Sequence, residues 1–231
     1  MDISMYYQEK GEGMPFVLLH GNGESGEYFK NQIEYFSNHY RMIALDTRGH
    51  GKTPRGTAPF TMDQFAEDLN AFLEEKNINN IILLGFSDGA NIAIKFALKY
   101  QDKIKVLILN GADLDTKGVK RSVQIPIEIG YKIARLFQNK SEEAKLKTEI
   151  LGLMVNEPNI KPEELHSIEV PTLVIAGTKD LIKENHSRLI AENIKDSELS
   201  FVEGNHFIAD KNPIEFNKEI EKFLVKTLKQ K

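Results

Sequence analysis

Residues 81–94 constrain the fold of this chain more than any other stretch of its sequence. Four bulky aliphatic residues open the stretch, which is typical of a strand buried on both faces of a parallel sheet. Gly-Phe-Ser-Asp-Gly follows at residues 85–89, and residues 93–100 are apolar at helical spacing. A strand that turns into a helix through Gly-x-Ser-x-Gly exposes the serine hydroxyl at a strained turn. The pentapeptide alone is common, but this context predicts that Ser87 is a nucleophile.

The composition is that of an ordinary globular protein. At 231 residues, the chain is long enough for one α/β domain with a substantial core and a small insertion. Its net charge of −4 comes from mixed charges along the chain, with no basic stripe that would favour a nucleic acid or a membrane surface as partner. The absence of cysteine excludes disulfides, thiolate zinc sites and a cysteine nucleophile.

The N-terminal residues lack the basic region and the apolar core of a signal peptide. No apolar run approaches the roughly 20 residues that a transmembrane helix needs. We therefore expect a cytoplasmic protein that acts on a small molecule and has no nucleic-acid or membrane partner.

Short apolar runs that end at turn residues alternate with helical patterns along most of the chain. The best-marked helix spans residues 61–76, where Thr61 and Gln64 can form a capping box. This alternation predicts an α/β fold, a mostly parallel sheet with helices on both faces. A short first strand is expected at residues 3–8, and the apolar runs lie at residues 16–19, 42–45, 81–84, 106–109, 172–176 and 199–202.

Residues 114–166 interrupt this alternation of strands and helices, and their pattern predicts two or three helices. Residues 123–137 are apolar on more than one face, and residues 141–154 are charged and amphipathic. We therefore expect a core made of residues 1–113 and 167–231, with residues 114–166 as a helical lid. Some apolar lid residues should line a substrate pocket, unless they only pack the lid onto the core; the candidates are Ile125, Ile127, Ile129, Ile133, Leu136 and Phe137.

The unusual polar residues of the chain follow the predicted strands. In open α/β sheets, ligands bind beyond the carboxyl ends of the strands, so we expect these residues to meet at one rim. They are residues 20–23, residues 46–51, Ser87, Asp113, Asp180 and His206.

A serine hydroxyl needs an adjacent base, and that base is usually a histidine oriented by a carboxylate. His206 is the favoured base because it follows the last strand, which gives the chain order Ser, Asp, His. His50 could line the site without touching Ser87, and His20 is expected to brace its loop. A solvated surface position is expected for the remaining three histidines, His39, His166 and His186.

Two carboxylates can serve as the acid. Asp180 ends a strand in Gly-x-x-Asp and is favoured, because its strand lies nearer the last one in the expected order. Asp113 ends the preceding strand and stays an alternative. Asp46 comes too early in the chain, and we expect it to brace its loop together with Arg48.

An oxyanion that forms on acyl attack needs two fixed donors, which are usually backbone N–H groups. The N–H of Asp88 is one candidate, since it follows Ser87 at the start of a helix. The second should come from the turn at residues 20–23, with the Asn22 N–H as the favoured group. The Asp88 carboxylate is interpreted as a favourable charge at the helix N-terminus.

Together these motifs resemble the α/β-hydrolase superfamily, in its branch of small single-domain hydrolases with a helical cap. The resemblance covers nearly the whole chain, and several motifs in the right order are far more specific than one. It identifies residues 20–23 with the oxyanion loop, residues 46–51 with the loop after the next strand, and residues 85–89 with the elbow. Residues 177–180 and 204–207 then correspond to the acid and base loops. Family members usually begin with an extra strand, and this chain starts too late to hold all of it.

The resemblance implies a serine hydrolase that cleaves a carboxylic ester or thioester through an acyl-enzyme intermediate, with Ser87, Asp180 and His206 as its triad. It implies no metal and no organic cofactor. Relatives with an aspartate or a cysteine nucleophile are excluded by the serine and by the lack of cysteine. Lactone hydrolysis, carbon–carbon bond hydrolysis, perhydrolysis and non-enzymatic ligand binding remain as alternatives.

Overall fold

A computed structural model describes residues 2–228 and contains one seven-stranded sheet in the order β1-β3-β2-β4-β5-β6-β7. β1 runs antiparallel to β3, and every other neighbouring pair is parallel. The structure therefore confirms the predicted mostly parallel α/β sheet. The strands are β1 (Tyr7–Lys10), β2 (Pro15–Leu19), β3 (Arg41–Leu45), β4 (Ile81–Phe86), β5 (Ile104–Asn110), β6 (Thr172–Gly177) and β7 (Ser197–Val202).

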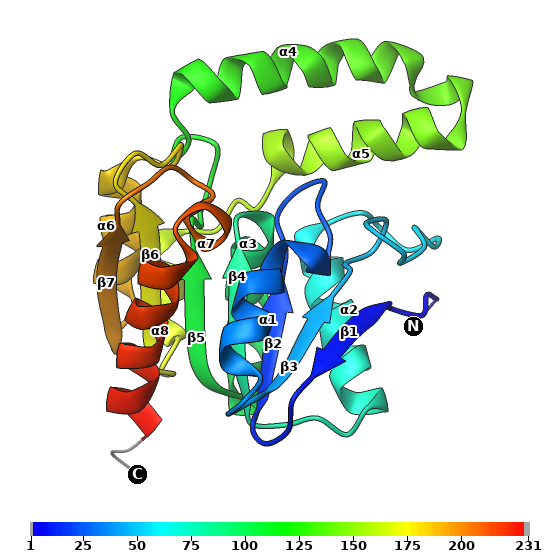
Figure 1. Cartoon of the computed structure of the whole chain (residues 1–231). Helices are drawn as coiled ribbons and strands as arrows, with labels where there is room; N and C mark the ends of the chain where they lie inside the picture. The colour runs from blue at the N-terminus through cyan, green and yellow to red at the C-terminus, as the bar shows by residue number, and fades with distance from the viewer. Residues whose placement is uncertain (1, 229–231) are drawn as a thin grey trace.

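Helices cover both faces of the sheet and also form a hairpin above it (Figure 1). The α-helices are α1 (Lys30–Phe36), α2 (Met62–Glu75), α3 (Asp88–Tyr100), α4 (Arg121–Phe137), α5 (Glu142–Asn156), α6 (Glu184–Asn193), α7 (Ile208–Lys211) and α8 (Pro213–Leu228). Short 3-10 helices span Gly26–Phe29, Gln101–Lys103, Gln138–Lys140 and Pro162–Ser167.

The two faces of β4 explain why the sheet needs helices on both sides. Ile81 and Leu83 join the core cluster shared with α2, α3 and α6, whereas Ile82 and Leu84 join the cluster shared with α1 and α8. Successive side chains of a strand point to opposite faces, so an uninterrupted aliphatic run must be covered on both faces of the sheet. All six residues of β4 are buried, which fixes this strand in the middle of the molecule.

The start of α2 forms half of the predicted capping box. The Thr61 hydroxyl accepts a hydrogen bond from the Gln64 N–H over 3.2 Å. The Gln64 side chain donates to Asp68 instead of returning to the Thr61 backbone. Thr61 therefore ends the preceding loop, while Gln64 supports a buried carboxylate on the same helix.

The first strand lies later than the sequence predicts. β1 spans Tyr7–Lys10, whereas the apolar residues at 3–8 suggested the strand. Ile3 and Met5 are buried in the core without pairing in the sheet, which explains why their pattern was misleading. Strand pairing begins only where Tyr7 comes opposite Leu45 of β3.

Residues 121–156 form a helical hairpin of α4 and α5 between β5 and β6, which agrees with the predicted helical character of this segment. α4 is the outermost element, and α5 lies between it and the rest of the molecule (Figure 1). A two-point ion pair between Arg55 and Glu149, with both contacts at 2.8 Å, ties α5 to a loop below it. In the part of the chain that the structure describes, no helix is long and apolar enough to cross a membrane.

Candidate active site

Ser87 occupies the sharp turn between β4 and α3. Its φ of 53° lies in the left-handed region, which a non-glycine residue adopts only when the surroundings hold it there. The flanking glycines permit the close approach of strand and helix. A Cβ on Gly85 would lie 2.2 Å from the Gly89 carbonyl oxygen, and one on Gly89 would lie 2.1 Å from the Leu19 carbonyl oxygen. The local geometry is that of an elbow that projects the serine from the sheet edge.

His206 and Asp180 approach Ser87 from loops far along the chain. The Nε2 atom of His206 lies 3.0 Å from the Ser87 Oγ, and its Nδ1 lies 2.7 Å from the Asp180 Oδ1. Both His206 and Asp180 are buried. With the proton on Nδ1, the imidazole donates to the carboxylate and leaves Nε2 free to accept the serine proton.

The Asp180 carboxylate is held in its ionised form. Burial is the largest single influence and would raise its pKa, but the hydrogen bond and electrostatic attraction from His206, together with the backbone N–H groups of Ile182 and Gly177, outweigh it. The net result is a pKa below the ordinary value. Asp180 thus keeps a negative charge facing the imidazole over the neutral pH range.

Asn22 and Asp88 meet through their side chains beside Ser87. The Asn22 Nδ2 donates to the Asp88 Oδ2 over 2.7 Å and to the Ile150 carbonyl of α5 over 2.9 Å. Burial raises the Asp88 pKa to about 6, and the hydrogen bond from Asn22 opposes that rise. From the sequence, only the backbone N–H of Asn22 is expected at the site. No local pattern reveals a bond to a helix more than a hundred residues away.

Asp113, the alternative acid, does not contact His206 in the described structure. Its Oδ1 accepts from the Asn91 Nδ2 and its N–H donates to the Asn91 Oδ1, both over 2.9 Å. Burial raises the pKa of Asp113 to about 7. Asp113 therefore lies at the site, but in a pair with α3 instead of beside the imidazole.

Asp46 and Arg48 both brace their loop as predicted, but each does so through its own partners. Asp46 accepts hydrogen bonds from the backbone N–H groups of Gly26 and Lys52. Arg48 is fully buried and pairs with Asp68 of α2 and with Asp2. Each residue braces the loop separately, because a buried guanidinium needs carboxylates that can reach its planar fork.

Three buried histidines other than His206 make structural contacts: His20, His50 and His186. His20 braces its loop as predicted, since its Nε2 accepts from the Thr47 N–H over 3.0 Å. His50 is buried beside Thr47 and contacts the Arg48 carbonyl through Nδ1. The expectation of a solvated His186 is wrong. Its ring is buried, and its Nε2 accepts from the Leu114 N–H over 2.9 Å, which anchors the chain as it leaves β5 for the hairpin.

Lys120 is a further residue that sequence reasoning missed. It precedes α4, and its Nζ donates to the backbone carbonyl of Asp180. This bond joins the start of the hairpin to the loop that carries the carboxylate. A single lysine before a helix carries no signal that would predict such a contact.

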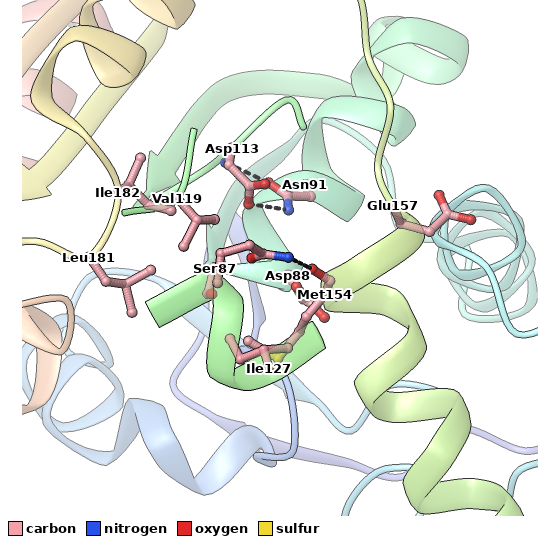
Figure 2. Close-up of a pocket in the computed structure, with 11 residues that line it drawn as sticks. Ser87, Asp88, Asn91, Asp113, Val119, Ile127, Met154, Glu157, Leu181 and Ile182 are labelled. Carbon is pink, nitrogen blue, oxygen red and sulfur yellow. Dashed lines mark hydrogen bonds between the residues drawn. The ribbon is translucent and has the colours of Figure 1, made fainter. Parts of the chain in front are cut away.

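A small cavity opens beside Ser87, under the hairpin (Figure 2). Of the six apolar hairpin residues proposed from the sequence, only Ile127 lines it, and the other five are exposed. Leu181 and Ile182 lie across the cavity from Ile127 and Met154. The remaining lining residues are Ser87, Asp88, Asn91, Asp113, Val119, Gln124 and Glu157. Among residues 2–228, no group of three His, Cys, Asp or Glu side chains could hold a metal ion.

Comparison with known proteins identifies the fold independently. The alpha/beta hydrolase fold family matches residues 14–126. The chain is 30% identical over 200 residues to (E)-2-((N-methylformamido)methylene)succinate hydrolase of Acinetobacter baylyi, which covers 76% of each chain. A bromoperoxidase from Bacillus anthracis superposes with a TM-score of 0.83 at 23% identity, covering 96% of this chain and 95% of that one. An esterase from Exiguobacterium antarcticum gives 0.82 at 22% identity and 96% of both chains, so these two structures show the fold alone.

Proposed function

The chain belongs to the α/β-hydrolase family, and from that premise we propose that it is a serine hydrolase cleaving a carboxylic ester or thioester through an acyl-enzyme intermediate. The observation that carries the proposal is the relay of 3.0 Å from Ser87 to His206 and 2.7 Å from His206 to Asp180. The strained turn at Ser87 supports it, because such strain persists mainly at functional sites.

In the proposed mechanism, the Ser87 Oγ attacks the acyl carbon while its proton passes to the His206 Nε2. The imidazolium, stabilised by Asp180, then gives this proton to the leaving oxygen or sulfur as the bond to the acyl carbon breaks. A water molecule attacks the acyl-enzyme, again losing a proton to His206, and the carboxylic acid leaves as Ser87 regains its hydrogen. We propose the backbone N–H groups of Asn22 and Asp88 as the donors to the oxyanion.

The cavity favours a short acyl group. Its walls combine apolar side chains, such as Ile127 and Leu181, with the carboxyl groups of Asp88 and Asp113. A long aliphatic chain would not fit unless the α4 side chains that line the cavity, such as Ile127, moved away. We therefore propose that residues 114–166 act as a lid that limits acyl length.

A fluorophosphonate probe tests the proposal directly, because it reacts with activated serines whatever the natural substrate. We expect labelling of the wild-type chain and none of Ser87→Ala, which should also lose about 10⁴-fold or more of its hydrolysis of 4-nitrophenyl acetate. Circular dichroism should show an unchanged fold. Absence of labelling on wild-type protein would contradict the hydrolase proposal and favour a ligand-binding role.

A panel of 4-nitrophenyl esters from acetyl to decanoyl, run beside acyl-CoA thioesters, then distinguishes ester from thioester preference. Labelling of Ser87 without turnover of any of these substrates would indicate another reaction on the same nucleophile, such as carbon–carbon bond hydrolysis.

A further inference from the structure

The outward face of α4 carries an unusual concentration of exposed apolar side chains. Five of the nine exposed large hydrophobic residues in the described structure lie on this one helix. They recur at spacings of three and four, so they share one face and form a stripe about 18 Å long at 1.5 Å per residue. We call them the outer stripe: Ile125, Ile129, Ile133, Leu136 and Phe137, with exposures from 43% to 78%.

The outer stripe cannot be buried by the hairpin itself. The opposite face of α4 is already occupied, since Ile127 lines the cavity and the Gln124 side chain donates to the Met154 carbonyl of α5. α4 is also the outermost element of the molecule, with α5 beneath it (Figure 1). A contiguous apolar patch in this position is typical of an interaction surface.

Charges beside the outer stripe indicate what covers it. Arg121, Lys132 and Arg135 lie along one edge of the stripe, together with Glu128, the only acidic residue of α4, and the helix has a net charge of 3 − 1 = +2. The whole chain carries −4, so this basic edge stands out from an acidic molecule. Lys140, just past α4, lies over the Phe137 ring at 4.4 Å.

We propose that α4 is a peripheral docking surface for an anionic lipid bilayer. Its outer stripe would enter the boundary between headgroups and acyl chains, and its basic edge would contact lipid phosphates. The combination of an exposed apolar face and flanking Lys and Arg is that of an amphipathic helix lying in a membrane surface. Charge balance along the linear sequence hides this feature, because the basic residues gather on one edge only in the folded helix.

A second copy of the chain fits the outer stripe less well. An isologous pairing of antiparallel α4 helices would bring the two basic edges to the same side of the contact, where their net positive charges repel. An anionic bilayer instead complements both the apolar stripe and the charge. The docked helix would hold the Ser87 cavity within about 10 Å, one helix diameter, of the lipid surface.

Vesicle co-sedimentation with the full chain tests this surface without depending on the proposed catalytic function. Wild-type protein should bind vesicles of equal parts phosphatidylglycerol and phosphatidylcholine at least roughly tenfold more strongly than pure phosphatidylcholine vesicles. Added salt should weaken this binding. Failure of wild-type protein to bind the anionic vesicles would overturn the proposal.

Variants separate the apolar from the electrostatic contribution. Ile129→Glu combined with Ile133→Glu should abolish binding, and Lys132→Glu combined with Arg135→Glu should remove the preference for anionic lipid. The matched control is Ile214→Glu, which changes an apolar residue with 67% exposure at the start of α8 and should bind as the wild type does. Equal loss in this control would contradict docking through α4.

If a second copy of the chain covers the outer stripe, the experiments give a different result. If light scattering shows a dimer that the Ile129 and Ile133 changes convert to a monomer, and vesicles do not bind, the stripe is an interface between copies and the proposal is wrong. Circular dichroism on each variant checks folding, and hydrolysis of 4-nitrophenyl acetate remains a separate readout of the proposed function.

Discussion

Asp180 provides the sharpest prediction at the scale of single residues. Asp180→Asn preserves the shape of the side chain but favours the wrong imidazole tautomer, so kcat should fall roughly 10⁴-fold. His206→Ala should be similarly damaging, and the double variant should lose little more, because groups acting as one unit are strongly non-additive. Measurements of kcat on 4-nitrophenyl acetate for the three variants check this. Losses that multiply in the double variant would contradict a single relay.

Asn22 carries a second prediction at this scale. Asn22→Ala removes the bonds of 2.7 Å to Asp88 and 2.9 Å to the Ile150 carbonyl, and so frees the proposed oxyanion loop from both α3 and α5. We expect kcat to fall about tenfold or more, since misplacing an oxyanion donor costs transition-state stabilisation. Arg55→Ala is the matched control, because it frees α5 from another loop by removing the pair with Glu149. An equal loss in both variants would assign the effect to the hairpin alone.

At the scale of elements, the structure follows the sequence closely where local pattern and tertiary packing agree. The buried run of β4, the helical residues of the hairpin and the loops with Asp180 and His206 could all be predicted from spacing and chain order. Pattern alone could not distinguish buried apolar residues from paired ones, as Ile3 and Met5 show before β1. It also could not reveal that His186 accepts a hydrogen bond from the Leu114 backbone. That contact exists only after α6 packs beside the segment between β5 and α4.

The two apolar faces of α4 allow a matched test of the lid. Ile127 lines the cavity, whereas Ile129 is exposed on the outer stripe. Ile127→Ala should enlarge the cavity and shift the preference of kcat/KM toward longer acyl chains, with a several-fold change in the ratio of hexanoyl to acetyl esters. Ile129→Ala should leave that ratio unchanged. Phe137→Ala should also leave it unchanged, since Phe137 does not line the cavity.

At the scale of the whole molecule, three of the four carboxyl groups whose pKa is raised by burial in the described residues lie around this cavity. Burial raises the pKa of Asp88 to about 6 and that of Asp113 to about 7, and it also raises the pKa of Glu157. All three line the same space, and no Lys or Arg is among the residues that line it. Ionising them in the folded state is unfavourable, so this region should contribute to the pH dependence of the stability of the fold.

Asp113→Asn isolates this dependence. The pKa of Asp113 is about 7 in the folded protein against an ordinary value of 3.8, so between these values the unfolded chain binds fewer protons than the folded one. The contribution of Asp113 to the free energy of unfolding therefore falls as pH rises from about 4 to 7. It levels off above that, because Asp113 is then ionised in both the folded and the unfolded state. The amide can still accept from Asn91 but cannot ionise. Its melting temperature should match the wild type near pH 4 and exceed it increasingly up to about pH 8. Thermal unfolding measured across this range checks the sign, and an advantage that is largest at pH 4 would show that Asp113 is stabilised as a carboxylate.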